Sequence, residues 1–319
     1  MREPITHPQG SLACPNAAIS RLGYAARAKL MAPITHRSRL HLLAAKDAPI
    51  IVILQRKRAK LFHVVTIDTV THQITEGSWF RGVLYGIDCD VSFDGHYMVY
   101  RARGTRLRGA TWSGVCRLPW LKTLVHVESP MTGGGYFPGP GRLATHGWDY
   151  RDLVESEEIP FKIARDNAYH LGDESAVIES RFARDGFKRL GDNWGTEEKI
   201  AGKKYRVACI GDDGWGLRPA DGYPMLQVRY LGYNMTGSGH DFGFSLEQHP
   251  QVVEGASWAT WDSGKTLWVA RPGLVTQYTL ADIRAGTPSF ALDVDRFEPP
   301  AGWLESPESK AERATLNSP

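Results

Sequence analysis

The sequence predicts a mostly β protein, an irregular antiparallel β-propeller of about five to six blades with one inserted helix. The first observation is a strand–turn–strand phrase that occurs twice, at residues 89–100 and 256–270. Each copy is an alternating apolar run, an Asp/Gly turn and a second alternating run, which is typical of a β-hairpin. The turn residues Asp94 and Asp262 lie 262 − 94 = 168 residues apart. That spacing equals four units of about 42, and propeller blades have about 40–45 residues.

Composition favours the same class. Ten tryptophans and 33 glycines in 319 residues suit aromatic strands joined by tight turns. A β-sandwich pair is the alternative architecture, because it also uses short strands at regular spacing.

The two ends of the chain differ in composition from the rest. Before Lys46 there are six Arg or Lys residues and one acid, Glu3. This resembles a transit peptide in composition, but prolines interrupt it and it has no amphipathic period. A disordered extension and a true start at Met31 are the alternatives. We expect residues 1–37 to lie outside the fold, residues 38–303 to form one β domain, and the polar residues 304–319 to be a disordered tail.

Strand signals fill most of the predicted domain. Residues 130–200 interrupt them, since 130–141 contain five glycines and three prolines and read as a loop. A helix is expected over 173–185, ended by Gly186, and we place it at a sheet edge or at the mouth of the propeller. The expected strands are 39–43, 49–54, 61–69, 89–100, 111–116, 121–127, 204–210, 225–233, 242–246, 256–270 and 274–280.

Several functional classes are disfavoured. A net charge of +3 gives no electrostatic basis for binding nucleic acid or an anionic membrane, and the longest apolar run, 48–54, is too short to span a bilayer. The four cysteines form no C-x-x-C pair, which favours reduced thiols in a cytoplasmic protein. The eleven histidines do not cluster at metal-ligand spacing. We therefore expect no metal and no cofactor.

Two segments imitate nucleotide-binding loops. Residues 259–266 fit a permissive phosphate-loop pattern, but such a loop needs a helix after it, and the residues after Lys265 read as a strand. We interpret this segment as a hairpin turn with Lys265 in solvent. Residues 139–144 imitate a dinucleotide fingerprint but lack the strand before and the helix after it.

The candidate binding residues are Trp79, Arg81, His146, Trp148 and Asp149. They lie in two polar–aromatic segments, 75–82 and 146–152, and exposed aromatic and charged loop residues commonly contact ligands. The alternative for the second segment is structural, with Trp148 in the core and Asp149 in a turn hydrogen bond.

We favour a non-catalytic binding or scaffold propeller that recognises a protein or a small ligand through its loop face. The alternative is a hydrolase whose carboxylates and histidines converge at the central channel. It requires at least two of a small set of residues to meet in one pocket. That set is Asp88, Asp90, His126, Glu128, His146 and Asp149.

Residues 40–303 resemble a bacterial protein family with a propeller-like, WD40-reminiscent β fold. The resemblance implies the fold and supplies no activity, ligand or site residue. It is carried by the segments 47–49, 77–82, 89–95, 258–262 and 297–303.

Overall fold

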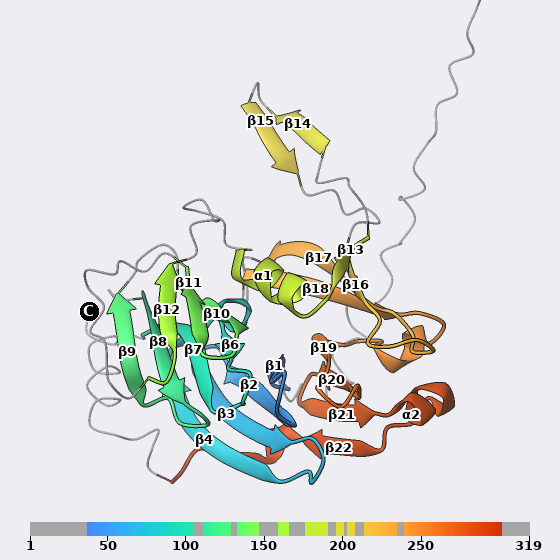
Figure 1. Ribbon diagram of the computed structural model, residues 1–319, viewed down its shortest axis with the longest axis horizontal. Helices are drawn as coiled ribbons and strands as arrows, with labels where there is room; N and C mark the ends of the chain where they lie inside the picture. The colour runs from blue at the N-terminus through green and yellow to red at the C-terminus, as the bar shows by residue number, and fades with distance from the viewer. Residues whose placement is uncertain are drawn as a thin grey trace, which may run out of the picture. The chain divides into compact units, whose positions relative to one another are not determined.

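The computed structural model describes residues 37–104, 111–128, 133–146, 159–165, 176–190, 196–200, 203–207, 214–234 and 239–301. Over these ranges the strands form five sheets arranged as the blades of a β-propeller, together with one separate hairpin (Figure 1). The predicted fold class is confirmed, with five blades.

The first two blades follow each other directly in the chain. Blade 1 is β1 (Arg39–Ala44), β2 (Ile50–Arg58), β3 (Leu61–Asp68) and β4 (Ile74–Arg81), paired in that order. Blade 2 contains β5 (Val83–Leu84), β6 (Asp90–Val91), β7 (Tyr97–Arg103), β8 (Thr111–Arg117) and β9 (Thr123–Glu128). A 3-10 turn, η2 (Gly86–Asp88), joins β5 to β6.

Blade 3 corrects the prediction of a loop over residues 130–141. It is formed by β10 (Gly135–Gly139), β11 (Arg142–Thr145) and β12 (Lys162–Arg165), and β11 pairs with β12 in parallel. The glycines permit close packing here: a Cβ on Gly134 would lie 2.0 Å from the carbonyl oxygen of Asp88 in blade 2. The glycines of residues 130–141 therefore indicate close contact between two blades as well as a turn.

Blades 4 and 5 complete the ring. Blade 4 is β13 (Lys188–Arg189), β16 (Trp215–Leu217), β17 (Leu226–Asn234) and β18 (Gly239–Leu246), and the hairpin β14 (Thr196–Ile200) and β15 (Lys203–Val207) lies between β13 and β16 in the chain. Blade 5 is β19 (Trp258–Trp261), β20 (Leu267–Arg271), β21 (Leu274–Tyr278) and β22 (Phe290–Asp293). A short 3-10 turn, η4 (Pro250–Val252), precedes β19.

A second helix, α2 (Leu280–Ala285), was missed by the sequence prediction. Its signal is a capping box in which Thr279 and Asp282 exchange side-chain and backbone hydrogen bonds, and Gly286 ends it at φ +73°. At six residues the helix is shorter than the window over which a helical period is legible.

The two copies of the hairpin phrase lie in blades 2 and 5, three blades apart, so the inferred spacing of four units of 42 is wrong. The structure also aligns the two turns differently from the sequence comparison of Asp94 with Asp262. The Gly95 amide donates to the Ser92 carbonyl (2.9 Å), and the Lys265 amide donates to the Asp262 carbonyl (3.1 Å). Gly95 and Lys265 both have positive φ, so Ser92 corresponds to Asp262. Equivalent residues are thus 262 − 92 = 170 apart, or roughly 57 residues per blade, longer than a standard blade.

Helix α1 (Ala176–Arg184) confirms the predicted helix over its described residues and lies between β10 of blade 3 and β18 of blade 4 (Figure 1). The helix and the residue after it contact all five blades, so the helix is on the inner side of the ring and not at one sheet edge. The contacts, in blade order, are Lys46 Nζ to Asp185 (3.0 Å), Arg181 to the Cys89 carbonyl (2.8 Å), Arg184 to the Phe137 carbonyl (2.8 Å), and the Phe182 ring against Trp215 (5.8 Å) and Trp258 (6.4 Å).

The ring closes between blades 1 and 5. The Gly273 amide donates to the Ser38 carbonyl (2.8 Å), and Ser38 donates its own amide to Asp295 in the 3-10 turn η5 (Val294–Arg296) (3.1 Å). Gln55, fully buried on β2, donates to the Val294 carbonyl (2.8 Å). These bonds satisfy buried polar groups at the seam and leave no open edge there.

Candidate functional site

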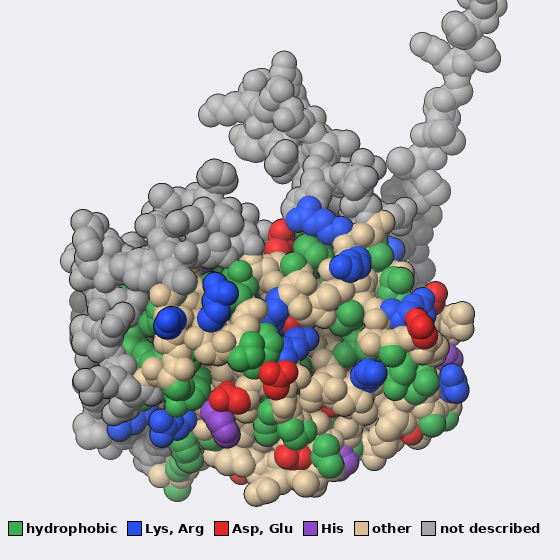
Figure 2. All heavy atoms as spheres, viewed as in Figure 1, with side chains coloured by type: hydrophobic (Ala, Val, Ile, Leu, Met, Phe, Trp, Pro, Cys, Tyr) green, Lys and Arg blue, Asp and Glu red, His purple; other side chains and the backbone are tan. Residues whose placement is uncertain are grey.

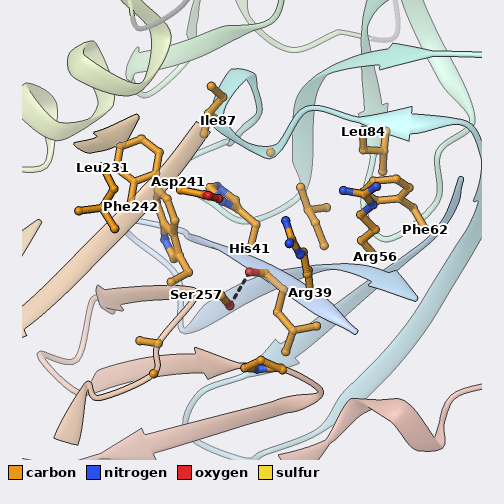
Figure 3. Close-up of a pocket in the computed structure, with 17 residues that line it drawn as sticks. Arg39, His41, Arg56, Phe62, Leu84, Ile87, Leu231, Asp241, Phe242 and Ser257 are labelled. Atoms are coloured by element: carbon orange, nitrogen blue, oxygen red, sulfur yellow. Dashed lines mark hydrogen bonds between the residues drawn. The ribbon is translucent and has the colours of Figure 1, made fainter. Parts of the chain in front are cut away.

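A pocket of about 350 Å³ opens at one mouth of the ring, between blades 1, 2, 4 and 5 (Figure 3). It is lined by the beginning of β1, the end of β2, η2, β18 and the residues that lead into β19. The repeated hairpin turns lie at the opposite end of the inner strands, where Asp47 donates its amide to the Phe93 carbonyl (2.9 Å) and Ser263 donates to the Ala48 carbonyl (3.1 Å). The recurring motif is therefore structural and separate from this pocket.

The walls of the pocket are largely apolar. Phe62, Leu54 and Leu84 line the side formed by blades 1 and 2, and all three are buried. Trp258 lines the other side, is 3% exposed, and is held by the rings of Phe242 and Phe244, each 5.5 Å away between centroids. Aromatic packing of this kind gives a wall that is fixed in position before any ligand arrives.

Two arginines lie side by side at one end of the pocket. Arg39 on β1 is directly opposite Arg56 on β2 in the antiparallel register, and both line the pocket. Within the described part of the chain neither guanidinium forms an ion pair, and Arg56 has one long bond to the Ala59 carbonyl (3.4 Å). Burial lowers the pKa of Arg56, and the charge of Arg39 lowers it further. Like charges directly opposite each other in a sheet are destabilising, so this pair weakens the hairpin that carries it.

His41 lies in the middle of the lining (Figure 3). Its ring is 3.9 Å from that of Trp258, and a Cβ on Gly86 would lie 2.8 Å from its Cγ. Burial, with a smaller contribution from Arg181, holds the pKa of His41 well below its usual value, so the ring is neutral near pH 7. Among the described residues, its enclosed Nε2 has no hydrogen-bond partner.

One acid, Asp241 on β18, also lines the pocket. With Arg39 and Arg56 charged and His41 neutral, the described lining has a net charge of +1. The pocket therefore combines a cationic end with apolar walls.

The predicted binding residues lie elsewhere. Trp79 and Arg81 are on β4, the last strand of blade 1, two residues apart and so on one face; Trp79 stacks on His63 at 4.0 Å. His146 follows β11, is 8% exposed, and its amide donates to the Gly134 carbonyl (3.1 Å). None of these three lines the pocket, and Trp148 and Asp149 lie outside the described residues. Their role in binding stays a prediction.

The described residues of the hydrolase alternative lie outside this pocket, although Asp88 and His146 both approach Gly134. Asp88 pairs with Arg101 at 3.0 Å, and Asp90 pairs with Arg184 on α1. His126 and Glu128 are exposed on β9. None of these lines the pocket, and the described ranges contain no group of His, Cys, Asp and Glu that could hold a metal ion.

Two further expectations can be checked. Residues 259–266 form the β19–β20 hairpin with Lys265 exposed at the turn, as predicted, and Asp262 accepts from the Thr266 amide (2.8 Å) and from Trp268 Nε1 (2.9 Å). Cys89 and Cys116 are free and buried, and burial raises the pKa of Cys89 to about 12. These two thiols are therefore unreactive core groups.

Arg39 and Arg56 were not recognised from the sequence, because Arg56 lies beyond the predicted strand 49–54. Only the register of β1 and β2 in the structure places the two arginines opposite each other. The space-filling view shows basic and acidic side chains interspersed over the described part of one face (Figure 2), so that face has no broad region of one charge.

In comparisons with protein-family models, curated proteins and solved structures, nothing matches this chain. The resemblance to a bacterial family, the cytoplasmic location and a protein partner therefore stay predictions. In the described residues no helix is long and apolar enough to cross a membrane.

Proposed function

We propose that this propeller is a binding protein that takes a small, mainly apolar organic molecule into the pocket at the mouth of its ring. The observation that carries the proposal is a cavity of about 350 Å³ with a pre-formed aromatic wall at Trp258. Ligand pockets in proteins are typically about 300–1,000 Å³, mostly apolar, with few polar groups. Helix α1 supports this wall from inside the ring through Phe182.

Binding without catalysis agrees with the described polar groups. The described carboxylates proposed for a hydrolase are paired with arginines or lie on β9, outside the pocket. The lining itself contains one acid, Asp241, and the neutral His41. The cavity offers burial of apolar surface, which is worth about 25 cal/mol per Å².

The proposal is tested by titrating the protein with 1-aminoanthracene, a neutral apolar dye whose fluorescence rises in apolar surroundings. We expect saturable binding to one site. Ala256→Phe, which fills the pocket from its lining, should weaken dye binding at least tenfold. Ala281→Phe on the exposed face of α2 is the matched control and should bind as the unmodified protein does.

Circular dichroism and thermal unfolding establish that both variants are folded. Absence of saturable dye binding, or unchanged binding by folded Ala256→Phe, would overturn the proposal.

A further inference from the structure

We infer that the ligand is an apolar monocarboxylate, with its carboxylate held by Arg39 and Arg56 and its hydrocarbon body against the Trp258 wall. This inference rests on the proposed function and adds the chemical class of the ligand. It is carried by the charges and shape of the lining.

The first argument is that Arg39 and Arg56 form a pair of positive charges without a described acid beside them. Facing residues of an antiparallel pair have Cβ atoms roughly 5 Å apart, so both guanidiniums can reach one anion placed between them. Arg39 is exposed and Arg56 is half-buried, and no described acid neutralises either one. A guanidinium presents a planar fork of donors that matches a carboxylate in two parallel hydrogen bonds. A bound carboxylate would remove the repulsion between the two arginines.

The second argument is the distribution of polarity along the pocket. In Figure 3 the side chain of Arg56 lies beside Phe62 and Leu84, and Arg39 lies between Arg56 and His41. Beyond His41 the lining continues to Phe242 and Trp258, with the carboxylate of Asp241 beside His41. A ligand that reaches both regions has one charged end and an apolar body.

The third argument concerns the number of charges on the ligand. Asp241 places a carboxylate in the same lining, which disfavours more than one negative charge on the ligand. A phosphate monoester near pH 7 has about −1.5 to −2 charges and is disfavoured by this carboxylate more than a monoanion is. His41 adds no positive charge near pH 7, because its pKa is far below that value. A carboxylate therefore fits the lining better than a phosphate.

The experiment measures binding of octanoate, octanamide and octyl phosphate by isothermal titration calorimetry. Octanoate and octanamide have the same chain length and differ in charge. We expect octanoate to bind at least tenfold more tightly than octanamide and more tightly than octyl phosphate. Higher salt should weaken octanoate binding and leave octanamide binding unchanged.

The variants are Arg39→Gln and Arg56→Gln, with Arg58→Gln as the matched control. Arg58 is exposed on the same strand as Arg56 and does not line the pocket. A hydrogen bond to a charged group contributes about 1.5–3 kcal/mol, so each pocket variant should weaken octanoate binding about 10- to 100-fold. Binding of octanamide should not change, and Arg58→Gln should behave as the unmodified protein. Arg39→Glu forms a favourable cross-strand pair with Arg56, so it should fold and lose octanoate binding.

The outcomes separate this inference from the proposed function. Equal binding of octanoate and octanamide, with no effect of the arginine variants, overturns the carboxylate assignment and leaves a neutral ligand for the same pocket. Tighter binding of octyl phosphate also overturns it, in favour of a phosphate monoester. Absence of saturable 1-aminoanthracene binding overturns the proposed function itself.

Discussion

The charged cluster between α1 and blade 2 should be the most sensitive point of the ring. The Asp90 side chain is 1% exposed and accepts hydrogen bonds from Arg184 and from the Phe137 amide (2.8 Å). Arg181 Nε lies 3.4 Å from Asp90 Oδ1. Asp90→Asn removes the charge with almost no change of volume, so its effect reports electrostatics and hydrogen bonding and not packing.

The expected magnitude follows from burial. The Arg181 and Arg184 side chains are 6% and 8% exposed, so water cannot replace the lost partner. Burial lowers the pKa of Arg181, whereas for Arg184 the effect of burial is outweighed by Asp90 and Asp185, which raise its pKa. Removing one member of a buried pair costs about 3–5 kcal/mol. That is a large part of a total stability of about 5–15 kcal/mol.

The assay is equilibrium urea unfolding followed by circular dichroism, with the free energy of unfolding extrapolated to water. Glu298→Gln is the control, since Glu298 is 70% exposed in its pair with Lys57 and an exposed pair contributes about 0–1 kcal/mol. If Asp90→Asn lies within about 1 kcal/mol of the unmodified protein, the helix is not held by this cluster and the reasoning fails.

Two further predictions concern stability. Thr279→Ala removes the capping box of α2 and should cost about 1 kcal/mol of unfolding free energy, measured by urea unfolding beside the exposed control Thr287→Ala; equal stability of the two variants would show that the cap is not needed. Burial, with a smaller effect of Lys57, lowers the pKa of His63 to about 4, whereas an unfolded histidine has a pKa near 6.5. The unfolded chain therefore takes up the proton first, so this contribution to stability is complete above about pH 6.5 and is lost as the pH falls toward 4. His63→Phe should flatten the decline of unfolding free energy over this window, the exposed His96→Gln should not, and an unchanged slope in His63→Phe would contradict the assignment.

Most strands of the ring could be predicted from local signals. The runs at 39–43, 61–69 and 274–280 alternate or are β-branched, and they became β1, β3 and β21. Blade 3 could not be predicted in this way, because Gly134, directly before β10, packs against Asp88, which is 134 − 88 = 46 positions earlier in the chain. A glycine that permits a close approach and a glycine that permits a turn look the same in sequence.

The candidate site was less accessible to prediction than the fold. Trp79, Arg81 and His146 stood out because aromatic and charged residues cluster around them, yet the pocket is built from Arg39, Arg56 and other residues with no local motif.

The sequence by itself determined most strands of the ring, the hairpin turns and the absence of a phosphate loop. Each depends on residues within one turn or one strand, such as Asp262 and the strand that follows Lys265. Only the tertiary structure decided that the two hairpins are three blades apart, that α1 contacts all five blades, and that Arg39 faces Arg56 beside an aromatic wall. These features depend on how separate blades pack against one another. The number of residues between two hairpin turns does not show how many of those residues are insertions that lie outside the blades.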